Sequence, residues 1–398
     1  MAVKQLPLLG PLRGFAACMV VLFHGRLLLF PQWKEPIAGV TQLIENGYLW
    51  VDLFFILSGL VMAHVYARTM ATKQVRIPRF LWLRLTRVYP LFITTMVVLI
   101  GWELFKQAHQ VGFYAGPLFR EWGFEGAPAF ESLFTPAAAL PSSLLLMQAP
   151  AGFGLTWNFA AWSLSVEWVS YLLFPLLLPL ALTHNRWSVL APLAALGLLA
   201  ALVFQHGTID LTSGAPAVGR GVAGFVIGVW LLRPVQATQL RPIARSDLLL
   251  GILFLVPLLL MHFTLTPLLT MAVLFSFVAL VWFAASQTER ETTGFLLLEN
   301  RFTRLMGDLS YSIYLWHAVL LLAGLELLHY LAPETVEAWY RVTDPLTTLA
   351  VVTLVMVLLW GLSWCSYRYI ERPAQRSLRR LFKRPGPEAA AESRVTAE

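Results

Sequence analysis

The chain has 398 residues, of which 58% are hydrophobic and 13% charged, and its mean hydropathy is +0.67. Soluble globular domains carry about 25% charged residues, so this composition excludes that class and indicates a protein with several membrane-spanning helices. The net charge of +7 does not indicate nucleic-acid binding, because the basic residues lie between apolar blocks and therefore report on topology.

Hydropathy predicts an all-α fold, a polytopic bundle of about ten membrane helices with both termini in the cytoplasm. With the N-terminus inside, 23 of the 29 Lys and Arg residues lie on cytoplasmic segments and 6 on outer segments, as the positive-inside rule requires. The first span lacks a small-residue cleavage site, so we expect it to be retained. The expected spans are 12–30, 48–66, 88–106, 157–181, 188–205, 217–232, 247–263, 267–285, 308–329 and 346–366.

Two segments outside the spans are distinctive. Residues 107–156 form a long outer loop, and within it LPSSLLLMQ at 140–148 is too short to cross a membrane, so we expect it to be re-entrant or interfacial. Residues 374–398 form a basic and then Pro-, Ala- and Glu-rich tail, which we expect to be disordered and attracted to anionic lipid. The chain thus divides into a membrane domain, 1–373, and a cytoplasmic tail. The two cysteines lie in apolar spans and offer neither a disulfide framework nor the spacing of metal ligands.

The first span carries an arginine near one end and a histidine near the other, in the stretch RGFAACMVVLFH. The eleven positions from Arg13 to His24 make about three helical turns, so the two side chains share one face at a separation of about 16 Å. Alone, Arg13 suits a cytoplasmic membrane anchor and His24 suits an interhelical hydrogen bond. Their common face favours a joint functional role.

The second and third spans add polar residues in VDLFFILSGL and RFLWLRLTRVYP. Asp52 lies near the outer interface, either as an exposed boundary residue or as part of a site, while Ser58 and Gly59 suit close packing against another helix. Arg84 and Arg87 are three residues apart and share a face at a helix start. They suit an anchor, and they also suit an anion site because paired guanidinium groups bind phosphate.

The fourth and ninth spans hold polar groups deeper in the membrane. Glu167, in WSLSVEW, lies near the midplane, where an anchor is excluded, so we expect it to face a polar interior and to pair with a cation or share a proton. Ser163 lies four residues earlier, on the same face. In GDLSYSIYLWH, Ser310, Tyr314 and His317 follow helical spacing and form one polar stripe.

Six short motifs in this order resemble the acyltransferase-3 family of integral membrane acyltransferases. The resemblance extends over residues 13–373, nearly the whole chain, and motifs that are weak alone become specific in combination. The motifs are Arg13 and His24 in an R-x10-H pattern, FFILSG at 54–59, RLTRVYP at 84–90, WSLSVE at 162–167, SYSIYLWH at 310–317 and YIERP at 369–373.

The resemblance implies an enzyme that moves an acyl group, usually acetyl from acetyl-CoA, to a hydroxyl of an envelope polysaccharide, a lipid-linked glycan or a small glycosylated molecule. It implies a bacterial cytoplasmic membrane protein with acyl-CoA as donor substrate and no permanently bound cofactor or metal. The expected site residues are catalytic His24, Glu167 and His317, donor-binding Arg13, Arg84 and Arg87, and supporting Asp52, Ser58, Ser163 and Tyr314.

In the resulting mechanism, the phosphates of coenzyme A meet the arginines and the pantetheine arm runs up the bundle, so that the thioester arrives near His24. His24 then acts either as general base on the acceptor hydroxyl, with Glu167 stabilising the imidazolium, or as a transient acyl carrier.

A proton-coupled transporter or exporter is the alternative, because intramembrane His, Glu and Arg suit it too, although no paired broken helices support it. A non-catalytic scaffold is disfavoured by the cost of the buried polar cluster.

Overall fold

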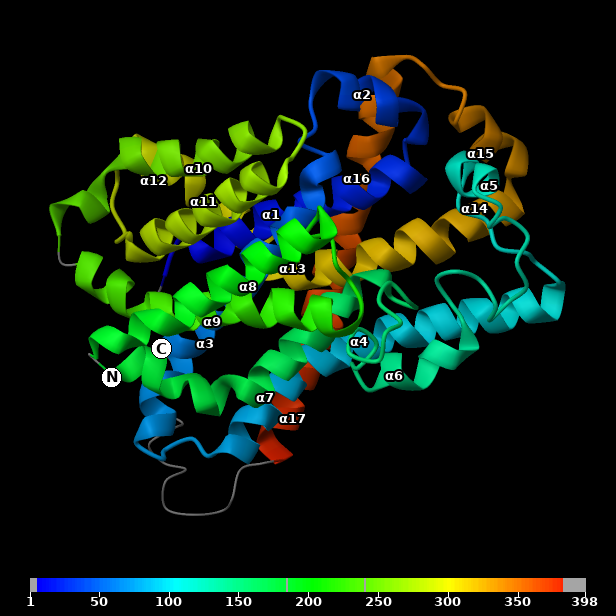
Figure 1. The fold of residues 1–398 in the computed structure, drawn as a ribbon. Helices are drawn as coiled ribbons and strands as arrows, with labels where there is room; N and C mark the ends of the chain where they lie inside the picture. The colour runs from blue at the N-terminus through cyan, green and yellow to red at the C-terminus, as the bar shows by residue number, and fades with distance from the viewer. Residues whose placement is uncertain (1–5, 184, 240, 382–398) are drawn as a thin grey trace.

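The computed structural model describes residues 6–183, 185–239 and 241–381, which form helices and loops with no strand among them. This confirms the predicted all-α bundle, and Figure 1 shows the long helices packed together with α5, α14 and α15 gathered near the end of α4. The long helices are α1 (Leu9–Leu28), α3 (Trp50–Ala71), α4 (Ile77–His109), α7 (Trp162–Leu182), α8 (Leu190–His206), α9 (Gly214–Thr238), α10 (Asp247–Met261), α11 (Pro267–Ser286), α13 (Arg301–Val319) and α16 (Pro345–Ser366). The short helices are α2 (Lys34–Val40), α5 (Pro117–Glu121), α6 (Leu140–Leu144), α12 (Thr293–Leu298), α14 (Leu325–Leu331), α15 (Pro333–Trp339) and α17 (Arg372–Leu381).

Each expected span coincides with a long helix. Within the described ranges, nine helical segments are long and apolar enough to cross a membrane, and the remaining expected span, α10, has 15 residues. Helix α4 begins at Ile77, with a proline in its first turn, so Arg84 and Arg87 lie inside the helix and not at its start. Helix α13 also begins earlier than expected, because Asn300 caps it by accepting hydrogen bonds from two backbone N–H groups of the first turn.

The expected disordered tail is helical where the structure describes it. A π-helical turn, Tyr367–Glu371, joins α16 to α17, and residues 374–381 continue as helix. Helix α17 packs along α4, where the indole N–H of Trp82 donates to the carbonyl of Leu378 at 3.0 Å. The prediction of disorder is therefore wrong for 374–381, because this packing orders them, and its remainder lies outside the described residues.

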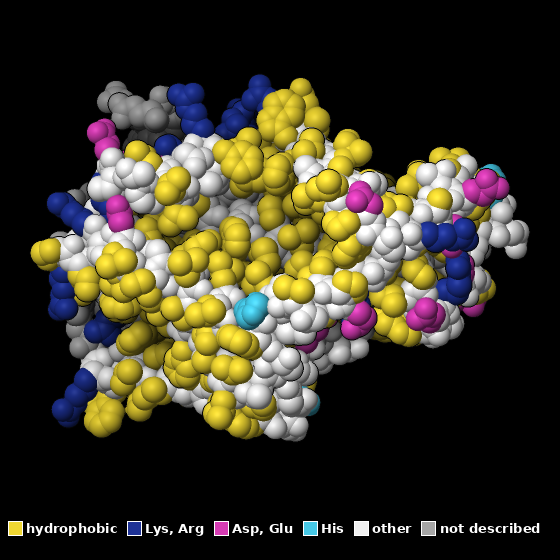
Figure 2. Space-filling model, turned by 90° about the horizontal axis from the view of Figure 1, so that it is seen from above, with side chains coloured by type: hydrophobic (Ala, Val, Ile, Leu, Met, Phe, Trp, Pro, Cys, Tyr) yellow, Lys and Arg dark blue, Asp and Glu magenta, His cyan; other side chains and the backbone are white. Residues whose placement is uncertain are grey.

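The surface has the polarity of a membrane protein. Figure 2 shows hydrophobic side chains over the middle of one face, with most Lys and Arg toward one end, and most Asp and Glu toward the other end, where a smaller group of Lys and Arg also lies. Large apolar side chains such as Leu176, Leu248 and Leu346 are each 76% exposed. Exposure of this kind suits contact with lipid, and the basic end agrees with the expected cytoplasmic side.

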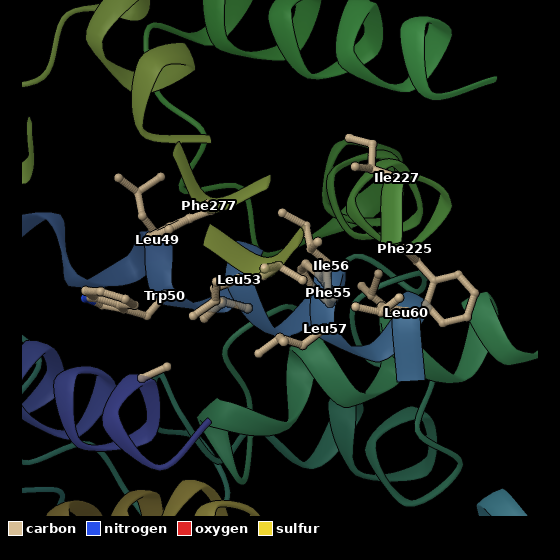
Figure 3. Packing of buried hydrophobic residues seen from close by; sticks show 14 of the residues in the cluster. Leu49, Trp50, Leu53, Phe55, Ile56, Leu57, Leu60, Phe225, Ile227 and Phe277 are labelled. Carbon is tan, nitrogen blue, oxygen red and sulfur yellow. The ribbon is translucent and has the colours of Figure 1, made fainter. Parts of the chain in front are cut away.

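Helices α3, α9 and α11 form the main apolar core (Figure 3), where Phe277 lies beside Trp50 at 5.1 Å between ring centroids. Helix α3 meets α9 through glycines. A Cβ atom on Gly59 would lie 2.1 Å from the carbonyl oxygen of Phe225, and one on Gly228 equally close to that of Ile56. Only glycine permits this approach, which confirms the close packing predicted for Gly59.

Helices α1 and α13 form a second close pair. A Cβ atom on Gly14 would lie 2.7 Å from the backbone of Met306, and one on Gly307 would lie 2.5 Å from the backbone of Gly10. Ten residues beyond Gly14 and Gly307, the two helices meet again at His24 and His317. The helices therefore run parallel in constant register, and this register brings the two histidines together.

The long outer loop is fastened to the bundle by a buried charge cluster. Lys106 Nζ lies 2.9 Å from both Glu103 Oε1 and Glu326 Oε1, and the three side chains are almost fully buried. The backbone N–H groups of Tyr114 and Phe130, both in the loop, donate to these carboxylates. Lys106 is thus not an exposed basic residue of the outer surface, because α4 continues to His109 and carries it into this cluster.

Candidate functional site

Three cavities follow one another beside the α1–α13 pair. We name them the mouth, inner and outer cavities, and their volumes are about 230, 150 and 180 Å³ respectively. The mouth and inner cavities share Arg13 and Arg87, while the inner and outer cavities share Tyr314. The mouth cavity is otherwise lined by residues such as Asp308 and Arg372, the inner by Ser58, Arg84 and Glu167, and the outer by His24, Phe159 and Asp210.

The three predicted donor-binding arginines line the inner cavity together. Arg87 is paired with Glu371 of the YIERP motif at 2.7 Å. Arg84 donates to the hydroxyl of Tyr66 at 2.5 Å. Within the described part of the chain, neither Arg13 nor Arg84 has a carboxylate at ion-pair distance. The three arginines outnumber the one carboxylate, Glu167, that lines the same cavity, so the cavity holds an excess of positive charge, which suits an anionic ligand.

Glu167 also faces the inner cavity, as expected for a carboxylate at mid-membrane depth. Its Oε1 accepts hydrogen bonds from the hydroxyls of Ser58 and Tyr171, the latter at 2.6 Å. It does not line the cavity that His24 lines. The hypothesis that Glu167 stabilises a His24 imidazolium is therefore wrong, because α7 presents this side chain to the arginine side of the bundle.

His317 takes the place beside His24. The distance from His317 Nε2 to His24 Nδ1 is 3.3 Å, and the ring of Phe159 packs against both imidazoles. His24 Nδ1 lies 3.0 Å from the carbonyl oxygen of Val20, and His317 Nδ1 lies 3.3 Å from that of Ile313. Each histidine is thus fixed by its own helix and by the other ring.

These contacts assign the tautomers of the neutral rings. A carbonyl only accepts, so each Nδ1 carries the proton, and His24 Nδ1–H is shared between Val20 and the lone pair of His317 Nε2. His24 Nε2 is then an unprotonated acceptor, and it has no hydrogen-bond partner among the residues that the structure describes. Because His24 lines the outer cavity, this nitrogen is available as a base there.

The predicted polar stripe of α13 divides between the two sides of this arrangement. Ser310 and Tyr314 line the inner cavity, and His317 is fully buried behind His24. The hydroxyls of Tyr314 and Ser163 are hydrogen-bonded at 2.8 Å. Ser163, like Glu167, lines the inner cavity, so the shared face predicted for these two residues of α7 is confirmed.

Asp52 is neither an exposed boundary residue nor a lining residue of the described cavities. It is 3% exposed, and Arg220 of α9 binds both of its oxygens, with Nε to Oδ1 at 3.0 Å and Nη2 to Oδ2 at 2.7 Å. Arg220 also lies over the ring of Trp162, which lines the outer cavity. Arg220, one of the six basic residues counted on the outer side, is therefore buried, because α9 begins at Gly214 and carries it into the bundle.

Several residues of the site were missed from sequence. Tyr171 lies four positions after Glu167, so helical spacing alone identifies it as a partner. Arg220 lies within the expected sixth span, and an arginine inside a span signals a buried partner. The aromatic residues of the outer cavity that come from the long loop, Phe119 and Phe134, carry no such signal.

Comparison with known proteins identifies the family. The sequence profile of the acyltransferase domain family matches residues 11–366 of the chain. The chain belongs to the acyltransferase-3 family. Members of this family are membrane acyltransferases, in agreement with the helices described above. No solved structure matches the chain.

Three curated bacterial proteins are similar to parts of this acyltransferase-3 chain. The chain is 29% identical over 164 residues to "Protein 2 in picA locus" of Rhizobium radiobacter, which covers 40% of the chain and 73% of that protein. It is 26% identical over 254 residues to "Acyltransferase MdmB" of Streptomyces mycarofaciens, covering 63% of the chain and 57% of that protein. It is 29% identical to an uncharacterized protein of Haemophilus influenzae over 34% of the chain and 51% of that protein. The chain thus spans only about half of the last two relatives.

Proposed function

We propose that this acyltransferase moves an acyl group, most simply acetyl, from acyl-CoA on the cytoplasmic side to a hydroxyl of a carbohydrate or glycosylated acceptor on the outer side. The observation that carries the proposal is the series of three cavities. Arg13, without a carboxylate partner, lies where the first two cavities meet, and His24, with a free Nε2, lines the third.

The donor is proposed from the charge of the inner cavity. Coenzyme A carries phosphates at one end and the thioester at the other end of a long thin arm. Arg13 and Arg84 offer guanidinium groups to the phosphates, and about 16 Å along α1 separates Arg13 from His24, a length that the pantetheine arm can span. Arg87 remains held by Glu371 and would contribute its remaining N–H groups.

The acceptor is proposed from the outer cavity. Its wall is largely aromatic, and the side chains of Asp210 and Thr212 add polar groups. A sugar ring has one face of C–H groups, which packs on aromatic rings, and a rim of hydroxyls, which bind carboxylates and hydroxyls. The long outer loop contributes to this wall through Phe119, Phe134 and Leu155, so it covers the acceptor.

The chemistry is proposed from the histidine pair. His24 Nε2 takes the proton of the acceptor hydroxyl, and the resulting imidazolium keeps its Nδ1–H bonds to the Val20 carbonyl and to His317 Nε2. His317 thus orients the base and stabilises its charge, while Glu167 acts on the donor side with the arginines. A transient acyl group on His24 Nε2 is the second route, since the same free nitrogen is the nucleophile.

We propose the cytoplasmic membrane of a bacterium as the location, since the curated relatives are bacterial and the basic end of the molecule suits a cytoplasmic face. The alternative of a proton-coupled transporter rests on the same intramembrane His, Glu and Arg. It predicts activity that requires a pH gradient and consumes no acyl-CoA.

The test uses inverted membrane vesicles that contain the protein, so that added [14C]acetyl-CoA reaches the cytoplasmic side. Octyl β-D-glucopyranoside serves as acceptor beside the endogenous glycans, and free thiol and labelled product are measured together. We expect thiol release and label transfer that depend on the protein and persist when an uncoupler abolishes the pH gradient. Absence of both above empty vesicles, or loss of both with the uncoupler, would contradict the proposal.

A further inference from the structure

The inner and outer cavities meet at Tyr314 of α13. Among the described residues, Tyr314 is the one side chain that lines both of them, with its ring 5.8 Å from that of Phe54 and 5.7 Å from that of His317. A donor held from the inner cavity and an acceptor held in the outer cavity can react only where the two cavities meet. The carbonyl carbon under attack must therefore lie close to the Tyr314 side chain.

The Tyr314 hydroxyl is prepared as a hydrogen-bond donor. Its oxygen lies 2.8 Å from Ser163 Oγ, whereas Ser163 Oγ lies 3.3 Å from the carbonyl oxygen of Ala160. Ser163 Oγ has one proton, which it can give to the Ala160 carbonyl or to the Tyr314 hydroxyl, and a ligand that accepts from Tyr314 favours donation from Ser163 to Tyr314. The tyrosine proton is then free to point into the cavity, and the bond from Ser163 makes the phenol a stronger donor.

Acyl transfer needs such a donor. When a hydroxyl attacks a thioester, the carbonyl oxygen gains a negative charge that must be stabilised where it forms. The base, His24 Nε2, lies on the acceptor side of the meeting point, and Arg13 and Arg84 serve the phosphates at the other end of the donor. Neither set of groups meets the developing oxyanion.

We propose that Tyr314 is a catalytic residue that donates its hydroxyl hydrogen bond to this oxyanion, and that Ser163 is its positioning residue. The acceptor oxygen bonds to the carbonyl carbon, its proton passes to His24 Nε2, and the carbonyl π electrons move onto the oxygen that Tyr314 binds. When the intermediate collapses, the C–S bond breaks, and the leaving thiolate takes the proton from His24. Tyr314 and Ser163 are unchanged at the end, and the inference rests on the proposed acyltransferase function.

The test compares two nucleophiles in purified full-length protein with acetyl-CoA as donor. Octyl β-D-glucopyranoside is the sugar acceptor, and hydroxylamine is a small nucleophile that needs no acceptor site. The variant Tyr314→Phe keeps the ring and removes only the hydroxyl. Because an oxyanion forms with either nucleophile, we expect kcat to fall by a similar factor of about 10² to 10³ with both, while the Kd for CoA stays within twofold.

Two further variants separate the proposal from a structural effect. Ser163→Ala should lower kcat about tenfold or less with both nucleophiles, and Ser163→Thr, which keeps a hydroxyl, should recover most of it. Tyr89→Phe is the matched control, because the Tyr89 hydroxyl donates to the Leu144 carbonyl outside the three cavities. It should retain the parent rate. Size-exclusion elution and thermal midpoint confirm that each variant is folded.

The outcomes are distinct. Loss with the sugar but not with hydroxylamine would mean that Tyr314 positions the acceptor, and a raised Kd for CoA at unchanged kcat would mean that it binds the donor. Either result, or full activity of Tyr314→Phe, overturns the inference and leaves the proposed function intact. A parent protein that consumes no acetyl-CoA with either nucleophile overturns the proposed function, and this inference with it.

Discussion

The inner and outer cavities adjoin at Tyr314 and differ in the kind of side chain that builds them. The inner cavity gathers three arginines and a carboxylate from helices α1, α4 and α7. The outer cavity gathers aromatic rings from the helices and from the long loop, with one histidine among them. A cavity suited to a charged ligand and a cavity suited to a ring of mixed polarity thus follow one another along one helix pair.

The difference explains why a membrane protein tolerates so many intramembrane polar groups here. A charge in the bilayer interior is costly, and a ligand of opposite charge offsets part of that cost only while it is bound. The outer cavity depends less on a charged ligand, because its wall is largely aromatic, Arg26 is paired with Glu45, and Asp210 lies 3.7 Å from Arg220. Substitutions at the histidine of the outer cavity should therefore alter kcat, whereas substitutions at the arginines of the inner cavity should alter the affinity for the donor.

The largest effect is expected from His24→Ala. Removal of a general base lowers kcat by about 10² to 10⁴, whereas CoA binding should persist because the arginines are untouched. Acetyl transfer and CoA binding by isothermal titration measure the two quantities. His262→Ala, at an exposed histidine whose Nδ1 contacts Thr41 Oγ1, is the control. Parent-like transfer by His24→Ala would end the assignment of the base.

A large effect on stability is expected from Arg220→Met, which leaves Asp52 charged and unpaired under the outer cavity. Removing one partner of a buried ion pair costs about 3–5 kcal/mol. The double variant Asp52→Leu with Arg220→Met should recover most of the loss, because an apolar pair leaves no buried charge. Thermal inactivation in detergent measures both. Equal stability of the single variant and the parent would show that the pair does not support this wall.

A smaller effect is expected on the inner side, from Arg13→Gln. Loss of a charge-assisted hydrogen bond to phosphate costs about 1.5–3 kcal/mol, which corresponds to a Kd for CoA raised by roughly 10- to 100-fold. The kcat at saturating donor should change little, and Arg341→Gln, on the outer side, should change neither quantity. A normal Kd for CoA together with a strongly lowered kcat would mean that Arg13 acts in catalysis and not in donor binding, and would contradict the division between the two cavities.

The smallest effect is expected at the loop that covers the outer cavity. Arg120 of α5 lies 2.5 Å from both Glu125 and Glu337, and Arg120→Ala should lower stability by less than about 1 kcal/mol, because this side chain is 45% exposed and salt screens the pairs. Hydrogen bonds from Arg120 hold the pKa of Glu337 below its usual value. A carboxyl with a lowered folded-state pKa stabilises above its unfolded pKa, so the contribution is present at neutral pH and disappears as the pH falls through the acidic range. Thermal midpoints of parent and variant should thus converge at acid pH or in 1 M salt.

Helical periodicity and hydropathy predicted what lies along each helix. The common face of Arg13 and His24 and that of Ser163 and Glu167 follow from 3.6 residues per turn, and the spans follow from apolar length. The first residues of the helices were predicted less accurately. Asn300 caps α13 through hydrogen bonds, and hydropathy does not detect such a cap.

Contacts between helices distant in the chain were not predictable from these patterns. Lys106 and Arg220 lie near the outer ends of their predicted spans, and their partners Glu326 and Asp52 lie on helices that only packing brings near. The same holds for His24, whose partner is 293 residues away. One sequence carries no pairing information at that range, so polar residues could be identified while their partners could not.

The close register of α1 and α13 has a mechanical consequence. Glycines at 10, 14 and 307 bring the two backbones into contact, and the histidines meet ten residues further along both helices. Two helices that are in contact at two separate points resist sliding and tilting against each other, so α1 and α13 would move as one rigid body. A rocking motion that opens the bundle alternately to each side of the membrane would need a hinge outside the α1–α13 pair. Arg13 and His24 would keep the same separation during such a motion.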